Sequence, residues 1–354
     1  MDTNKNLFPW LEWIDSPVFC VKDGVIIAAN YPAEQRNLSV GMDIRQIVTD
    51  QREAYDTFQN GSLYLTIQVC GLPCPASVTR TQDCDIFHLQ RDGEDGTLQA
   101  LALAASELRI PLANVLTVAD RLLAKLEEND EETRKQAGQM NQNLYRLLRI
   151  ISNMSDAGNL VHTGMETADL TALIDEIMDK AQAFFADAQV SLAYTGLDNS
   201  VFTLVNQEKL ERAIYNLLSN AAKFASPGST ITASLTKSDS QIQFTVCNTT
   251  EDTLCQGNMW HRYRREPAIE DPRHGLGLGM TLISNAATIH GGTVLVDHPK
   301  AGITRVTMTL PIKKENTGNL RSPVLRIGDY AGGRDKGLLE LAELLSSDAY
   351  NHIN

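Results

Sequence analysis

The stretch from residue 211 to residue 224 reads ERAIYNLLSNAAKF and decides the fold of the longest region of the chain. Its apolar residues recur in steps of three and four, the spacing of one face of an amphipathic helix. They are Leu210, Ile214, Leu217, Ala221 and Phe224. Asn216, Asn220 and Lys223 fall on a neighbouring stripe of the same helix. Because Mg²⁺ prefers oxygen ligands and phosphates favour a nearby cation, the stripe predicts a phosphate site with Asn220 as the Mg²⁺ ligand and Asn216 supporting it.

A glycine-rich segment lies downstream at residues 274 to 280, HGLGLGM, and runs directly into the apolar stretch 281 to 287. Gly275, Gly277 and Gly279 allow backbone N–H groups to approach a phosphate at the start of a helix, where the helix dipole also attracts anions. A bare alternation of glycines is more typical of a flexible loop. Here it is followed by AATIHGGT and by a strand pair that ends at residues 309 to 312. This ordered combination predicts an ATP-type binding fold.

These segments resemble the nucleotide-binding domain of histidine kinase, gyrase and Hsp90-type ATPases, which implies a Bergerat-type (GHKL) α/β sandwich that binds ATP and Mg²⁺. In that family an Asp followed by spaced glycines reads the adenine. Asn248 stands at that position, and no glycine follows it in residues 249 to 252. An Asn accepts the same hydrogen bond without the charge, so we expect weaker nucleotide binding. Residues 259 to 265, MWHRYRR, resemble the family's lid, and a solvated basic loop fits them equally well.

Residues 98 to 158 have a helical periodicity that is interrupted by the polar pair Asn129 and Asp130. One apolar series comprises Leu101, Ala105, Leu108, Leu112, Val115, Ala119, Leu122 and Leu126, and the other Ala137, Met140, Leu144, Leu147, Ile151 and Met154. The two series predict a helical hairpin with more apolar surface than it buries alone. Pairing two chains into a four-helix bundle would bury the rest, so we expect a homodimer. A monomeric hairpin packed on neighbouring domains is the alternative.

Residues 106 to 112, SELRIPL, resemble the acceptor motif of sensor histidine kinases. Ser106 stands in place of the phosphorylated histidine, and Ile110 in place of the Thr or Asn linked to dephosphorylation of the partner. A serine hydroxyl needs a base to act as a nucleophile, and Glu107 is the carboxylate that resembles the family's base. A solvated serine without chemistry is the more common role of such a residue. Pro111 lacks an N–H and is expected to kink the helix.

The N-terminal region contains short β-rich runs, and Asp23-Gly24 between two of them predicts a hairpin. Residues 16 to 44 resemble the start of a PAS sensory domain, with a generic small α+β module as the alternative. The expected organisation is multidomain α+β: a PAS-like α/β sensor at 1–92, a dimerisation hairpin at 93–160, the ATP-binding domain at 161–314, and a linker with a short helix at 315–354. We expect the helix at residues 337 to 345 to dock on the protein's own surface.

Composition sets the expected environment. A net charge of −13 argues against nucleic acid as a partner, because phosphate backbones are bound by clustered Lys and Arg. The N-terminus lacks the apolar core of a signal peptide, and we expect no stretch to approach the ~18 apolar residues of a membrane span, so a cytoplasmic protein is predicted. The six cysteines fit no common zinc pattern and are expected to be reduced, mostly buried thiols. His88 and His162 lack the acceptor pattern and are expected to be ordinary histidines.

Two function classes arise from the resemblance. The chain is either a nucleotide-binding, dimeric signalling scaffold that has lost its acceptor, or an active kinase that phosphorylates an unconventional residue or a partner. In both cases the expected partner is a response regulator or another histidine kinase. Loss of the His and Thr equivalents at Ser106 and Ile110 favours the scaffold, whereas Asn220, Lys223 and the glycine segment favour dependence on nucleotide.

Overall fold

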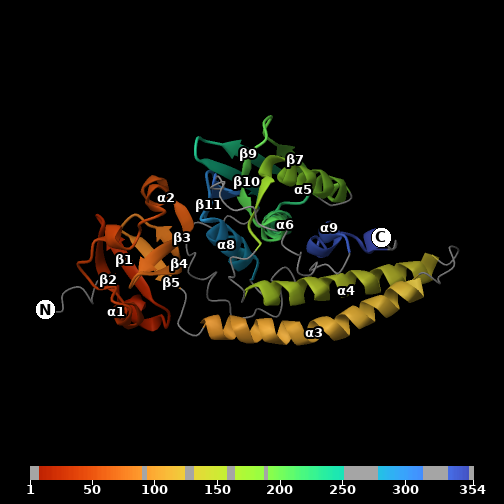
Figure 1. Ribbon diagram of the computed structural model, residues 1–354, viewed down its shortest axis with the longest axis horizontal. Helices are drawn as coiled ribbons and strands as arrows, with labels where there is room; N and C mark the ends of the chain where they lie inside the picture. The colour runs from red at the N-terminus through yellow and green to blue at the C-terminus, as the bar shows by residue number, and fades with distance from the viewer. Residues whose placement is uncertain are drawn as a thin grey trace.

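The structure is a computed structural model that describes residues 8–89, 94–123, 131–157, 164–186, 190–250, 278–313 and 334–350. A second α/β part lies along one side of a long helical hairpin, and an N-terminal α/β part lies beyond the end of the hairpin where its first helix begins (Figure 1). The chain's last described segment lies between the hairpin and the second α/β part.

The N-terminal part is an antiparallel layer of five strands in the order β2-β1-β5-β4-β3. The strands are β1 Val18–Lys22, β2 Val25–Ala29, β3 Gly61–Val69, β4 Leu72–Arg80 and β5 Asp85–Leu89. Helices η1 Pro9–Trp13, α1 Tyr31–Gln35, η2 Ile44–Gln46 and α2 Arg52–Thr57 flank them. Asp23 and Gly24 have φ of 51° and 77°, which is the type I′ geometry that matches strand twist, so the predicted hairpin is confirmed.

The strand β4 is absent from the sequence prediction because it contains Pro73 and Pro75, which cannot donate to a strand ladder. Only the half of β4 from Ala76 to Arg80 pairs with β5, so both prolines lie where β4 has a neighbour on one side alone. The turn before it lies at Cys70 and Gly71.

The predicted hairpin is formed by α3 Glu94–Leu123 and α4 Glu131–Ala157. Its buried apolar residues include Ala105, Leu112, Leu116, Ala119, Leu144, Leu148 and Ile151, while Tyr145 contacts the C-terminal segment. The helix α3 continues through Pro111. By length and composition alone, residues Gln99–Leu122 satisfy the requirements of a membrane span, contrary to the sequence expectation that no stretch approaches one. The absence of a membrane span therefore stays a prediction.

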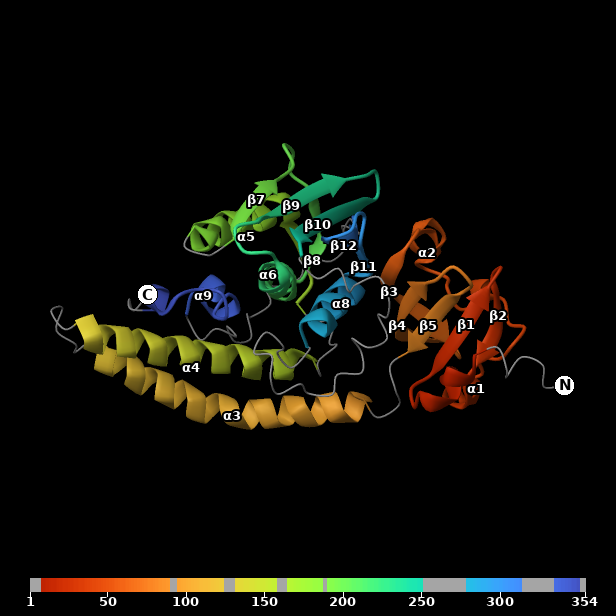
Figure 2. The ribbon, with the colours of Figure 1, turned by 180° about the vertical axis from the view of Figure 1, so that it is seen from behind.

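The second α/β part contains a five-strand layer in the order β11-β12-β10-β9-β7. Its strands are β7 Ser191–Thr195, β9 Thr230–Lys237, β10 Gln241–Thr249, β11 Thr293–Asp297 and β12 Ile303–Pro311, and β6 Glu166–Asp169 pairs separately with β8 Phe202–Val205. The helices are α5 Leu170–Phe185, α6 Gln207–Phe224 and α8 Leu278–His290. The helices α6 and α8 lie between this layer and α4 (Figure 2). The fold is thus a mixed α/β chain in which helices cover one face of a layered sheet, as expected.

The two α/β parts share one continuous sheet of ten strands. The strand β3 pairs antiparallel with β11, with Leu63 opposite Leu295. Gly61 begins β3 at a φ of 88°, and a Cβ there would collide with the Val296 carbonyl, so only glycine permits this approach. The Gln51 side chain joins the same seam by donating to the Gly292 carbonyl at 2.7 Å. The sequence carries no signal of this pairing.

The C-terminal segment forms α9 Lys336–Glu340 and the short 3-10 helix η4 Ser347–Tyr350. The helix α9 is shorter than the predicted helix at 337–345. At its start, the Asp335 side chain accepts from the Leu338 N–H at 3.0 Å. The leucines of this segment lie in the shared core with α4, α5 and α6, namely Leu338, Leu339, Leu341 and Leu345. The expected docking on the protein's own surface is confirmed.

Candidate functional site

The helix α6 presents the polar stripe that the sequence predicts. Asn206 caps its start, where the side chain accepts from the Lys209 N–H at 3.0 Å. The predicted apolar positions are buried at Leu210, Ile214, Leu217 and Ala221. Phe224 is 42% exposed, so its assignment to the apolar face was wrong, because it lies at the last residue of the helix, beyond the cover of the core.

The structure brings Asn216, Asn220 and Gly279 together. Gly279 lies in the first turn of α8, and a Cβ added to it would stand 3.3 Å from the Asn220 amide nitrogen and 3.6 Å from the Asn216 amide oxygen. A larger side chain would therefore press on both amides. Gly275 and Gly277, and the predicted lid at residues 259 to 265, lie outside the described residues.

Asn216 is buried and bonded within the protein. Its Nδ2 donates to the Arg212 carbonyl at 2.9 Å, and its Oδ1 accepts from Arg149 at 3.4 Å. One turn later, Asn220 is partly exposed. Asn220 is thus the amide on α6 that is open to a ligand, and Asn216 fixes the helix behind it.

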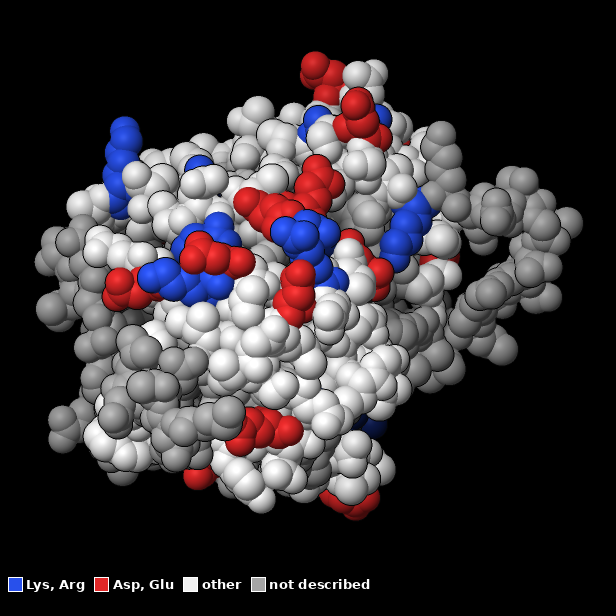
Figure 3. Space-filling view, turned by 90° about the vertical axis from the view of Figure 1, so that its left-hand side faces the viewer, with Lys and Arg blue, Asp and Glu red and all other residues white. Residues whose placement is uncertain are grey.

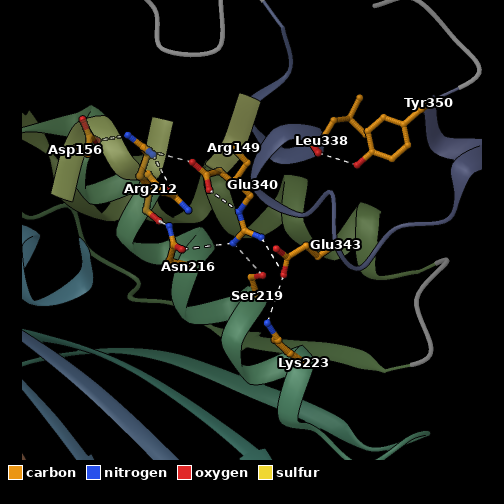
Figure 4. Close-up of polar contacts among 11 residues, drawn as sticks. Arg149, Asp156, Arg212, Asn216, Ser219, Lys223, Leu338, Glu340, Glu343 and Tyr350 are labelled. Carbon is orange, nitrogen blue, oxygen red and sulfur yellow. Dashed lines mark hydrogen bonds and ion pairs between the residues drawn. The ribbon is translucent and has the colours of Figure 1, made fainter. Parts of the chain in front are cut away.

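Lys223 faces the C-terminal segment. Its Nζ lies 3.7 Å from a carboxylate oxygen of Glu343, and the same carboxylate lies 3.6 Å from Arg149 (Figure 4). The Lys223 side chain is 15% exposed and that of Glu343 is 39% exposed. The cation that the sequence predicts for phosphate therefore lies beside a carboxylate of its own chain.

A buried ion network joins the hairpin, α6 and the C-terminal segment. Glu340 is fully buried, and its two carboxylate oxygens lie 3.3 Å from Arg149 of α4 and 3.1 Å from Arg212 of α6. Arg212 also pairs with Asp156, near the end of α4. Sequence reasoning missed this network. The available signal was an arginine within each apolar helix, together with the acidic LLELAELL stretch.

Asn248 ends a row of inward-facing residues on β10, after Ile242, Phe244 and Val246, on the face covered by helices. Asn248 is 6% exposed, and within the described structure its Nδ2 is buried without a hydrogen-bond acceptor. The Ser226 N–H donates to the Thr249 carbonyl at 2.8 Å, which holds this end of β10 beside the residues that follow α6. An unsatisfied buried amide is costly, so a ligand with an acceptor, such as a purine ring nitrogen, fits this position.

Burial shifts several titratable groups around α6. Burial raises the pKa of Glu211, although Lys336 donates to it at 2.5 Å and opposes that shift, and burial also raises the pKa of Glu208. The pKa of His290 is lowered by burial. Its Nε2 accepts from the Asn206 N–H at 2.9 Å and its Nδ1 donates to the Ala286 carbonyl at 2.6 Å, which describes a neutral imidazole.

The acceptor-like motif lies on the outer surface of α3. Ser106 and Glu107 are both exposed, and the Ile110 side chain is 72% exposed. A donor would therefore reach the Ser106 hydroxyl without rearrangement of the hairpin. The structure thus shows that the Ser106 side chain is accessible from solvent.

The N-terminal part carries a cavity of about 490 Å³ between the β1–β2 turn, α2 and the β4–β5 turn. Its charged lining mixes both signs, comprising Lys22, Asp23, Arg45, Arg52, Asp56, Arg80, Asp83 and Asp85. Seen from this end of the molecule, basic and acidic side chains intermingle on the surface (Figure 3). Such a lining indicates no particular ligand class.

The five cysteines that lie in described ranges are free thiols. Cys20 and Cys84 are buried, Cys74 and Cys247 are half-buried, and Cys70 is exposed, so burial was predicted correctly for only part of the set. Across those same ranges, no group of three or more His, Cys, Asp or Glu side chains is placed to hold a metal ion.

Residues 205–314 match the family of histidine kinase-, DNA gyrase B- and HSP90-like ATPases. Among curated relatives, the hybrid signal transduction histidine kinase D of Dictyostelium discoideum is 27% identical over 227 residues, which are 60% of this chain and 15% of the relative. The adaptive-response sensory kinase SasA of Crocosphaera subtropica is 26% identical over 251 residues, or 64% of each chain. The sensor histidine kinase YcbM of Bacillus subtilis is 24% identical over 225 residues, which are 61% of this chain and 72% of the relative.

Among solved structures, full-length ShkA in complex with AMPPNP is 19% identical and covers 61% of this chain and 46% of that chain, with a TM-score of 0.45. The chain thus spans less than two thirds of the length of several of these proteins. Residues 205–314 thus form a domain of the histidine kinase-, DNA gyrase B- and HSP90-like ATPase family, and the chain is similar to sensor histidine kinases.

Proposed function

We propose that this protein binds ATP with Mg²⁺ and works in two-component signalling as a dimeric regulatory scaffold that does not phosphorylate itself at the usual position. One observation carries the proposal. The exposed acceptor position on α3 holds Ser106, while Asn220 and Gly279 of the ATPase domain lie together. The residues proposed to bind nucleotide are thus present in a chain that has a serine at the position of the acceptor histidine.

The described side chains fit a nucleotide with a hard cation. The amide oxygen of Asn220 would ligate Mg²⁺, and Lys223 would meet the phosphates. Asn248 would read the purine through its unpaired amide. Bound Mg²⁺ would neutralise charge on the phosphates.

The replaced acceptor explains why phosphotransfer would stop. A neutral imidazole is a competent nucleophile at pH 7, whereas the Ser106 hydroxyl needs a base positioned to take its proton. Glu107 is adjacent in sequence and exposed to water. With Ile110 in place of a polar residue, the position associated with dephosphorylation of a response regulator also lacks a hydrogen-bonding group.

Dimerisation would use the outer face of the hairpin. Large apolar side chains at least 36% exposed line this face, namely Leu108, Val115, Val118, Leu122, Met140, Leu147 and Ile150. A second copy would cover this stripe and complete a four-helix bundle. The α3 part of this stripe lies within Gln99–Leu122, the stretch that meets the length and composition of a membrane span. That a second chain covers it, in a cytoplasmic protein, is part of the proposal.

The N-terminal part would act as a PAS-like input domain, and a response regulator or a second histidine kinase would be the partner. Support comes from the five-strand layer with its cavity and from the direct pairing of β3 with β11 of the ATPase domain. A signal that shifts this layer would reach the nucleotide domain through the shared sheet.

The deciding experiment incubates the full chain with γ-labelled ATP and Mg²⁺, alone and with candidate partners. We expect no acid-labile label on the unmodified protein, and label on Ser106→His if the missing imidazole is the only defect. Acid-stable, base-labile label on Ser106 would instead establish an active kinase, the alternative that the exposed Glu107 beside Ser106 favours. Ser106→Ala would confirm the labelled position, since it removes the hydroxyl and leaves the nucleotide site intact.

A further inference from the structure

The C-terminal segment lies in the gap between the hairpin and the nucleotide-binding helix α6. The helix α9 contacts α4, α5 and α6, and η4 contacts α4. Both views of the ribbon show this segment between α4 and α5, beside α6 (Figures 1 and 2). Its position allows it to act on the relation between the hairpin and the nucleotide site.

Specific polar contacts fix the segment on α4. Gln142 donates to the Leu345 carbonyl at 2.6 Å, Arg146 to the Ala342 carbonyl at 3.0 Å, and Asn141 to the Tyr350 carbonyl at 3.1 Å. Three side chains of one helix thus hold carbonyl groups that no regular helix or strand satisfies. Such contacts define one docked register and distinguish this segment from a loosely packed tail.

The carboxylate of Glu340 links this segment to both α4 and α6. It is fully buried between Arg149 of the hairpin and Arg212 of α6. A buried charge is tolerated only where its partners are in place, so docking of Glu340 requires that α4 and α6 keep their present separation. Undocking would remove the carboxylate that bridges the two arginines, while Arg212 would keep its pair with Asp156 of α4.

The carboxylate of Glu343 completes the arrangement at the nucleotide site. It lies 3.7 Å from Lys223 and 3.6 Å from Arg149, and its side chain stays 39% exposed (Figure 4). A phosphate group carries more charge and more acceptor oxygens than a carboxylate and would compete for the same ammonium group. The docked segment and a nucleotide phosphate would therefore compete for the ammonium group of Lys223.

We propose that residues 334–350 form an autoinhibitory clamp in which Glu340 locks α6 onto the hairpin and Glu343 occupies Lys223 in place of nucleotide phosphate. This inference rests on the proposed nucleotide binding. Coupling of this kind is reciprocal: if the docked segment lowers ATP affinity, bound ATP must loosen the docked segment by the same factor. Nucleotide occupancy would thus control how firmly the hairpin and the ATPase domain are joined.

The test compares ATP·Mg²⁺ affinity of the full chain with that of Glu343→Gln by titration calorimetry. We expect the variant to bind two- to fivefold more tightly, the range of a partly exposed ion pair. Glu176→Gln is the matched control, because Glu176 forms an exposed pair with Lys180 at 2.8 Å on α5, and its affinity should equal that of the unmodified chain. Hydrogen exchange of residues 338–350 should also become faster when ATP and Mg²⁺ are added.

The outcomes separate the two claims. If ATP binds equally well to the unmodified chain and Glu343→Gln, and exchange of the segment is unchanged by ATP, the clamp is overturned and nucleotide binding stands. If neither protein binds ATP, the proposed function falls and the clamp falls with it. Should both variants at positions 343 and 176 gain affinity alike, general charge reduction explains the effect, and the clamp is again overturned.

Discussion

Asn220 is the single side chain on which Mg²⁺ binding depends most directly. It is the partly exposed amide of α6 and faces Gly279 of α8. We expect Asn220→Ala to lower the metal-dependent affinity for ATP by about tenfold or more, on the basis of ~1.5 kcal/mol for a lost contact to a charged group. Titration of ATP with and without Mg²⁺ measures this. Asn199→Ala, on an exposed loop of the same domain, should bind as the unmodified chain does; equal affinity of all three proteins would contradict the assignment.

Asn248 should set both the strength and the selectivity of base recognition. Its amide donates as well as accepts, so it tolerates the oxygen of guanine at the place where adenine carries an amino group. Asn248→Asp should strengthen ATP binding about fivefold through a charge-assisted bond worth ~1 kcal/mol, and should weaken GTP binding. Competition of ATP and GTP against a fluorescent nucleotide measures both changes. Asn199→Asp adds the same charge elsewhere on the domain, so an equal shift in that variant would argue against direct contact.

Single residues show how far the sequence predicts this site. The helical spacing correctly placed Asn216, Asn220 and Lys223 on one helix and correctly left Ser106 exposed. It did not predict that Asn216 is bonded to Arg149, because that contact joins residues 67 positions apart. Periodicity describes one element at a time, whereas burial of a polar group depends on which other element packs over it.

At the scale of elements, the apolar residues of α3 and α4 lie on two different surfaces of the hairpin. Leu112 and Leu144 are buried between the two helices, and a charge at either would disrupt the hairpin itself. Leu108 and Leu147 are each 49% exposed on the outer face, where a second copy would cover them. The sequence series contained residues of both kinds, because a spacing of three and four cannot separate an inner seam from an outer one.

We therefore expect the double variant Leu108→Glu and Leu147→Glu to convert the dimer to a monomer, because pairing would bury unpaired carboxylates. Light scattering after gel filtration measures the mass. Leu72→Glu introduces the same change at a strand end that is 70% exposed and should leave the dimer intact. A monomeric mass for the unmodified chain would remove the proposal of a bundle.

The C-terminal segment also shows the limits of predictions from local sequence patterns. The acidic, leucine-rich stretch predicted a helix through residues 337–345, yet the α-helix ends at Glu340, and the chain beyond it bends so that Leu345 and Tyr350 are buried. The Tyr350 hydroxyl returns to donate to the Leu338 carbonyl at 2.8 Å, and its ring contacts Tyr145 edge-on. Tertiary contacts with α4 outweigh helix propensity in this short segment.

At the scale of the whole molecule, the half-buried His88 and the buried His290 should make stability depend on pH. Burial lowers the pKa of His88 and of His290 below the ordinary value of 6.5 in the folded state. As pH falls through about 6.5, the unfolded chain gains protons that the folded chain does not, so folding stability is lost by up to ~1.4 kcal/mol per pH unit for each histidine. Glu208 and Glu211 have raised pKa values and act in the opposite direction at lower pH.

The variant His88→Gln isolates one of these contributions, because glutamine still offers a polar partner to Ser16, which lies 2.7 Å from His88 Nε2. We expect the melting temperature of the unmodified chain to fall more steeply between pH 7 and pH 6 than that of the variant. Thermal unfolding at several pH values measures the two slopes. Parallel slopes would show that His88 takes up no proton on unfolding in this range.

The pairing of β3 with β11 has a practical consequence for anyone who divides this chain. An ATPase fragment without residues 8–89 would present β11 to water with a bare row of N–H and C=O groups, which invites pairing with a second fragment and precipitation. The N-terminal fragment alone would expose β3 in the same manner. Each half of the molecule is thus the protective cover of the other, and soluble, active pieces will come from boundaries that keep both strands together.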